Sequence, residues 1–95
     1  MRNYELMYIL KPDLDEEKVM TIIEKFSALI NNHGGELISA DKWGKRRLAY
    51  EIKDYREGIY VLVNFKGIAG TAQELDRVMK ITDEILRFMI LSKEE

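Results

Sequence analysis

The sequence predicts an α+β fold with the element order βαββαβ, a four-stranded antiparallel sheet with two helices on one face. Two observations lead to this prediction. Apolar residues alternate with period two in four segments, and they recur at helical spacing in two segments between those strands. The chain is also 95 residues long, a length that suits one such unit, so we expect a single domain over residues 1–95.

The first strand is expected at residues 4–10, and Pro12 ends it because proline lacks a backbone donor. Asp13 is placed to cap the following helix, with Glu16 at the matching capping-box position. The helical stripe that follows is formed by Val19, Ile22, Ile23, Phe26, Ile30 and His33. Gly34 then supplies a left-handed C-cap, which ends the helix.

Residues 36–52 form an unusually long extended segment, which is expected to bend near Gly44 because glycine interrupts the strand pattern there. Residues 53–58 are polar and predict a hairpin connection. Residues 59–65 are the clearest strand of the chain. Its core-facing side chains are Ile59, Val61, Val63 and Phe65.

The sequence Thr71-Ala72-Gln73-Glu74 is a capping box that opens the second helix, with Leu75, Val78 and Met79 pointing inward. Residues 85–91 form the last strand, with Phe88 and Ile90 facing the core. This succession of elements is that of the ferredoxin-like fold.

The sheet face opposite the helices is expected to carry apolar residues. Strand alternation places Met7, Ile9, Tyr60, Leu62, Met89 and Leu91 there, together with Arg87. An apolar area of this size on a small protein favours a binding partner. The alternative is that these side chains pack among themselves on a half-exposed sheet.

The segment from Asp41 to Arg56 is the basic part of the chain, with six cations and three anions, whereas the whole chain has a net charge of −2. Lys45, Arg46 and Arg47 are consecutive in an extended ribbon next to Trp43. Fixed cations beside an aromatic side chain suit a nucleic-acid backbone. The alternative interpretation is a solvated edge strand, whose charges discourage aggregation.

Nothing in the sequence forms a convincing catalytic constellation, so the protein is not expected to be an enzyme. The only histidine, His33, stands where a helix ends and is interpreted as a partner of that helix end. Cysteine is absent, which excludes disulfides and thiolate metal sites. No cofactor, metal ion or small-molecule substrate is expected, and no apolar run is long enough for a transmembrane helix.

Three motifs resemble those of the bacterial small-subunit ribosomal protein S-six (S6) family of the 30S subunit. They are Met1-Arg2-Asn3-Tyr4-Glu5, Trp43-Gly44-Lys45-Arg46-Arg47-Leu48-Ala49-Tyr50, and Lys80-Ile81-Thr82-Asp83-Glu84-Ile85-Leu86-Arg87-Phe88-Met89. The resemblance covers essentially residues 1–93. It implies a ferredoxin-like structural protein of the cytoplasmic ribosome, which binds the central domain of 16S ribosomal RNA together with the smaller basic protein S-eighteen.

The resemblance also implies which residues contact RNA. They are Arg2, Arg46, Arg47, Lys80 and Arg87, with Lys45 as a neighbouring cation. Trp43 fills a position that is apolar in the family and is interpreted as packing, and Glu51 stands where members often have proline. Two other functions remain as alternatives: a small ferredoxin-like enzyme, and a homo-oligomeric ligand-sensing module that would pair through the open sheet face.

Overall fold

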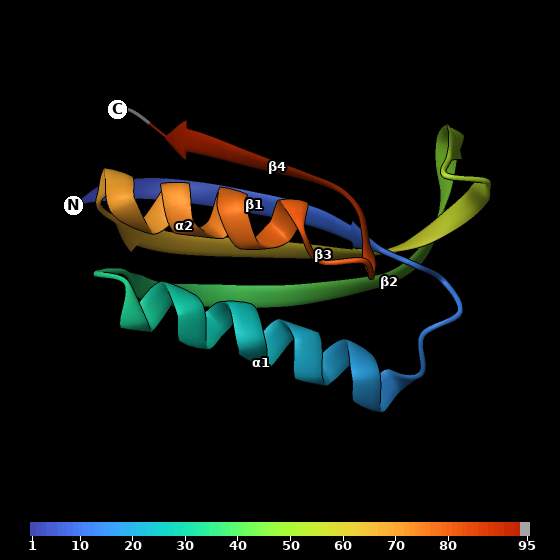
Figure 1. Cartoon of the computed structure of the whole chain (residues 1–95), viewed down its shortest axis with the longest axis horizontal. Coiled ribbons are helices and arrows are strands. Elements are labelled where there is room, and N and C mark those ends of the chain that lie inside the picture. The colour runs from blue at the N-terminus through green and yellow to red at the C-terminus, as the bar shows by residue number, and fades with distance from the viewer. Residues whose placement is uncertain (94–95) are drawn as a thin grey trace.

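A computed structural model describes residues 1–93 as one sheet with both helices on the same face (Figure 1). The elements are β1 (Arg2–Leu10), α1 (Glu16–Asn32), β2 (Glu36–Ile52), β3 (Tyr55–Gly67), α2 (Ala69–Lys80) and β4 (Ile85–Lys93). The strand order is β2-β3-β1-β4, and every neighbouring pair is antiparallel. The predicted fold class is therefore confirmed.

The main core lies between the helices and the two central strands. Alternate residues of β1 and β3 are buried there: Tyr4, Leu6, Tyr8, Leu10, Ile59, Val61, Val63 and Phe65. Tyr8 meets Phe26 of α1 edge to face, with ring centroids 5.7 Å apart, and Tyr4 stacks on Phe65. The side chains that alternation assigned to the helix-covered face are the ones that fill this core, so the predicted strand phase is confirmed.

The two predicted helix starts were each wrong by two or three residues. α1 is capped by Asp15 and not by Asp13, because the Asp15 carboxylate accepts a hydrogen bond from the Lys18 amide at 2.8 Å. α2 begins at Ala69, so Thr71 lies inside its first turn. Thr71 is fully buried, and its hydroxyl donates to the His33 carbonyl at 2.6 Å. A capping sequence therefore fixed the neighbourhood of each start but not its register.

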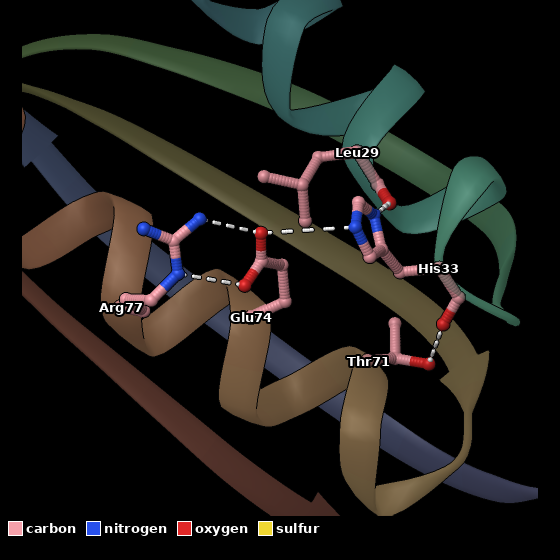
Figure 2. A network of polar contacts seen from close by, with 5 residues as sticks. All are labelled: Leu29, His33, Thr71, Glu74 and Arg77. Carbon is pink, nitrogen blue, oxygen red and sulfur yellow. Dashed lines mark hydrogen bonds and ion pairs between the residues drawn. The ribbon is translucent and has the colours of Figure 1, made fainter.

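Polar contacts join the end of α1 to the beginning of α2 (Figure 2). His33 Nδ1 lies 3.0 Å from the Leu29 carbonyl oxygen, and Nε2 lies 3.7 Å from Glu74 Oε2. Arg77 donates two hydrogen bonds to Glu74 at 2.8 and 2.7 Å. These bonds hold the pKa of the Glu74 carboxyl below its usual range. His33 is thus a partner of the helix end, as its position in the sequence indicated.

The hairpin of β2 and β3 is longer than predicted. Its connection is a two-residue turn at Lys53 and Asp54, whose φ angles of 48° and 70° are the left-handed geometry of tight hairpins. Ile52 pairs directly with Tyr55, so residues 55–58 belong to β3 and not to a loop. The predicted bend is confirmed at Gly44, which has a φ of 85° and lies where the register shifts.

The first prediction concerns the Tyr8 hydroxyl, which is buried and has no hydrogen-bond partner among residues 1–93. Burial raises the pKa of this phenol, so it stays neutral. Tyr8→Phe should leave stability unchanged or raise it by up to about 1 kcal/mol, because no hydrogen bond is lost. Phe26→Ala should lower stability by about 3–5 kcal/mol through the cavity it leaves. Urea unfolding measures the stability of both variants. A clear loss of stability in Tyr8→Phe would show that the Tyr8 hydroxyl does form a hydrogen bond.

Candidate nucleic-acid interface

The outer part of the β2–β3 hairpin turns away from the line of the other strands (Figure 1). A second apolar cluster holds it there: Ile9, Leu48 and Leu86 are 6%, 8% and 5% exposed. These residues come from β1, β2 and β4, so the outer part of the hairpin packs against the end of the sheet on the face opposite the helices. Half-buried Ile52, Tyr55 and Tyr60 pack against the same cluster. The basic ribbon, which is the part of the hairpin that carries Lys45, Arg46 and Arg47, is therefore held against the sheet and is not a free arm.

This brace corrects one part of the predicted open face. Ile9 lies on that face but is buried beneath the hairpin, and Tyr60 is half-buried in the same cluster. Alternation identified the correct face of β1 but could not show that a later hairpin folds back over it. The accessible remainder consists of Met7, Leu62, Met89 and Leu91, with Trp43 beside them.

Gly58 makes the close approach of the hairpin possible. It is buried and pairs with Arg46, and a Cβ atom added there would overlap the Ile9 side chain. A larger residue at this position would require the Ile9 side chain or the hairpin to shift.

A polar contact joins β4 to the outer part of the hairpin. The Arg87 guanidinium of β4 donates a hydrogen bond to the Tyr50 hydroxyl of β2. It also lies 5.5 Å from the centroid of the Tyr50 ring, within cation–π range. Tyr50 nonetheless remains 60% exposed. One predicted RNA-contact residue is thus attached to the hairpin through an aromatic side chain that the sequence analysis had not assigned to the site.

The three consecutive cations remain available. Lys45, Arg46 and Arg47 are exposed, and within residues 1–93 none of them forms an ion pair with an acidic side chain. Neighbouring cations are engaged: Arg56 lies 3.5 Å from Glu51, and Lys42 pairs with Glu16 of α1. These three cations therefore form no ion pair with a described carboxylate, although Glu57 stands opposite Arg47 in the strand register.

These cations do not share one surface. Lys45 pairs with Ile59, a residue that faces the helices, and it lines a shallow hollow beside Val19 of α1. Arg46 pairs with Gly58, whose missing side chain would point toward Ile9 on the opposite face. Adjacent strand residues point to opposite faces, so the Arg47 side chain points to the same face as the Lys45 side chain. The ribbon is charged on both sides.

The remaining predicted RNA-contact residues lie at two ends of the molecule. Arg87 pairs with Ile9, and Lys80 ends α2 on the same side as the hairpin, where it forms an ion pair with Asp76 at 2.7 Å. Arg2 pairs with Gly67 at the far end of the sheet. The structure thus brings Lys80 and Arg87 to the end that carries the ribbon but leaves Arg2 apart from it.

The uncovered part of the sheet contains a hollow of about 180 Å³. Its lining is Glu5, Met7, Trp43, Leu62, Met89 and Leu91. Trp43 was predicted to pack; it does border this apolar area but stays 49% exposed. A polar row across the strands bounds the area: Lys93 contacts Glu5 at 3.5 Å and Asn64 at 3.2 Å, and Asn64 donates to Ser39 at 3.2 Å. Once the strand register is known, these residues can be recognised in the sequence as cross-strand neighbours.

Other kinds of site find no support in the described part of the chain. Among residues 1–93, no three metal-ligating side chains come together in a way that could hold an ion. Neither α1 nor α2 has the length and apolar character needed to cross a membrane.

The fold is a small ferredoxin-like domain that carries a basic hairpin held against its sheet. The family model described as Ribosomal protein S6 matches residues 3–92, and the chain belongs to that family. Small ribosomal subunit protein bS6 of Desulforamulus reducens is 56% identical over 95 residues, and that of Desulfitobacterium hafniense is 53% identical, each covering 100% of both chains. The crystal structure of 30S ribosomal protein S6 from Thermotoga maritima matches with a TM-score of 0.92 and 31% identity, over 97% of this chain and 87% of that one.

Membership of this family makes the chain a non-enzymatic, structural protein of the small ribosomal subunit, located on the cytoplasmic ribosome. The predicted family, the predicted absence of enzyme activity and the predicted location are confirmed.

The second prediction tests the brace. Gly58→Ala should lower stability by about 1–3 kcal/mol, because the added methyl group overpacks the contact with Ile9. Gly70→Ala in α2 is the matched control: its Cβ would meet only Ile68 at 3.8 Å, and alanine favours a helix. Thermal unfolding of both variants measures the difference. A Gly58→Ala protein as stable as the Gly70→Ala protein would show that the hairpin does not press on β1.

Proposed function

We propose that this protein binds the central domain of 16S ribosomal RNA together with ribosomal protein S-eighteen and acts by positioning, not by catalysis. One observation carries the proposal: Lys45, Arg46 and Arg47 are exposed, lack acidic partners within residues 1–93, and stand on a hairpin braced by buried contacts. Cations fixed in place bind phosphates without first losing conformational freedom.

The proposed RNA surface is the hairpin end of the molecule. Arg46 and Arg47 would contact phosphates on the two sides of the ribbon, with Lys45 beside them. Lys80 and Arg87 extend the same end. Arg2, at the other end of β1, would contact a separate RNA segment. Contacts at both ends would hold two parts of the RNA at a set separation, which is a positioning function.

The third prediction tests the ribbon. In the Arg46→Ala/Arg47→Ala protein, the slope of log affinity against log salt should fall in magnitude by about 1.5, since each lost phosphate contact contributes about 0.7–0.9. Lys18→Ala/Lys25→Ala removes the same charge from α1 and should leave the slope unchanged. Filter binding to a central-domain transcript, with and without S-eighteen, measures both. Equal slopes for the two double variants would contradict the proposal.

The proposed surface for S-eighteen is the apolar area left open on the sheet. Trp43, Met89 and Leu91 are 49%, 50% and 48% exposed there, and Met7 and Leu62 lie between them. Apolar patches bordered by polar groups mark interaction sites more often than empty surface. Ile9 and Tyr60, which belonged to the original prediction, support this surface from beneath the hairpin instead of forming it.

The fourth prediction tests this surface. Met89→Lys/Leu91→Lys should fold with little loss of stability, because both side chains are half exposed and lysine can keep its ammonium group in water. Association with S-eighteen should fall sharply, because the complex would bury two unpaired charges. Ile9→Lys is the contrasting variant and should destabilise the fold strongly. A double variant that binds S-eighteen as the wild-type protein does would exclude the open sheet face as the binding surface for S-eighteen.

A further inference from the structure

We infer that a hollow beside Tyr50 binds one unstacked nucleotide of the RNA, with its base lying on the Tyr50 ring. This inference rests on the proposed function, because it names the kind of RNA feature that the hairpin receives. It adds a stacking site to the phosphate contacts, and Tyr50 becomes a binding residue of the protein.

The hollow has a volume of about 300 Å³ and lies on the hairpin itself. It is lined by Arg47, Leu48, Tyr50, Glu51 and Arg56. This volume is at the lower end of the range for small-molecule sites, which suits a single nucleotide better than a larger ligand. The lining combines an aromatic ring, an aliphatic side chain, a carboxylate and two guanidinium groups.

Each of these groups has a matching part in a nucleotide. The Tyr50 ring offers a flat surface for a base, and the guanidinium groups of Arg47 and Arg56 can bind the phosphate. The Glu51 carboxylate lies 3.5 Å from Arg56, and its oxygens can accept hydrogen bonds from base or ribose. Sequence-specific RNA recognition uses splayed-out bases stacked on aromatic side chains.

The Tyr50 ring is held in place before any ligand arrives. Arg87 donates to its hydroxyl and lies over the ring, yet Arg87 does not line the hollow. The ring is therefore fixed on one side by β4 and open on another toward the hollow. The Tyr50 side chain is 60% exposed. A fixed, exposed ring loses little conformational entropy when a base stacks on it.

A continuous RNA helix would not need this ring. The bases of a helix are stacked on one another, so a protein reaches mainly phosphates and 2′-hydroxyl groups. The ribbon cations alone would serve for that contact. The ring, the carboxylate and the hollow together favour a nucleotide from a bulge, a loop or a strand end.

The experiment compares Tyr50 variants in binding to a central-domain 16S transcript with S-eighteen present at saturation. Tyr50→Leu should weaken binding about 5- to 100-fold, the range for losing one aromatic–base stack, and should leave the salt slope unchanged. Tyr50→Phe and Tyr50→Trp keep a ring, so their affinity for the RNA should stay within a few-fold of that of the wild-type protein. Ile38→Ala removes an exposed apolar side chain from the other end of β2 and should have no effect.

The outcomes separate this inference from the proposed function. If Tyr50→Leu binds RNA normally while Arg46→Ala/Arg47→Ala shows the reduced salt slope, the stacking site is wrong and the phosphate site stands. If the original protein binds the transcript with no dependence on salt, the proposed function itself fails. If Tyr50→Phe or Tyr50→Trp binds as weakly as Tyr50→Leu, the ring is not the binding surface, and the hydroxyl bond to Arg87 is what matters. Tyr50→Leu is expected to fold because the side chain it replaces is 60% exposed, and Tyr50→Ser provides the ring-free comparison if it does not.

Discussion

The buried contact among Ile9, Leu48 and Leu86 is the interaction on which the functional end of this protein depends. A two-stranded hairpin is marginally stable by itself in water. Burying each of these aliphatic side chains contributes about 1.5–3 kcal/mol, enough to hold the hairpin against the sheet. Without this contact, the cations of residues 45–47 would move with a flexible arm and would bind RNA at a higher entropic cost.

The distribution of charge follows from the same arrangement. Two of the acidic residues near the start of α1 have local partners: Asp15 caps the helix, and Glu16 pairs with Lys42. Such exposed pairs contribute little stability. Glu16 pairs with Lys42, whereas Lys45, Arg46 and Arg47 form no ion pair with a described carboxylate. A chain with a net charge of −2 can therefore present a positive end to a polyanion.

Most of the fold could be predicted from the sequence because strand faces and helix stripes follow fixed periods, and Gly44 and Gly34 mark backbone shapes that other residues avoid. The errors have a common physical origin. Asp13 and Asp15 both suit a helix cap, and only tertiary packing decides between them. The face predicted for Ile9 is correct, but the exposure predicted for it is wrong, because Leu48, about forty positions later in the chain, covers it. Tyr50 belongs to the quoted motif but was not predicted as a site residue, because its role depends on Arg87, which only the folded chain brings near.

The position of the brace also bears on how two partners would share this molecule. Ile9 supports the hairpin from one side and borders Met7, a member of the open apolar face, from the other along β1. A protein bound to that face would restrict the strands on which the hairpin rests, and RNA bound to the hairpin would restrict the same strands. Ordering of these strands by one partner would then lower the entropic cost of binding for the other. Since coupling between two binding sites is reciprocal, each partner would raise the affinity of the other by the same factor, with no need for the two to touch.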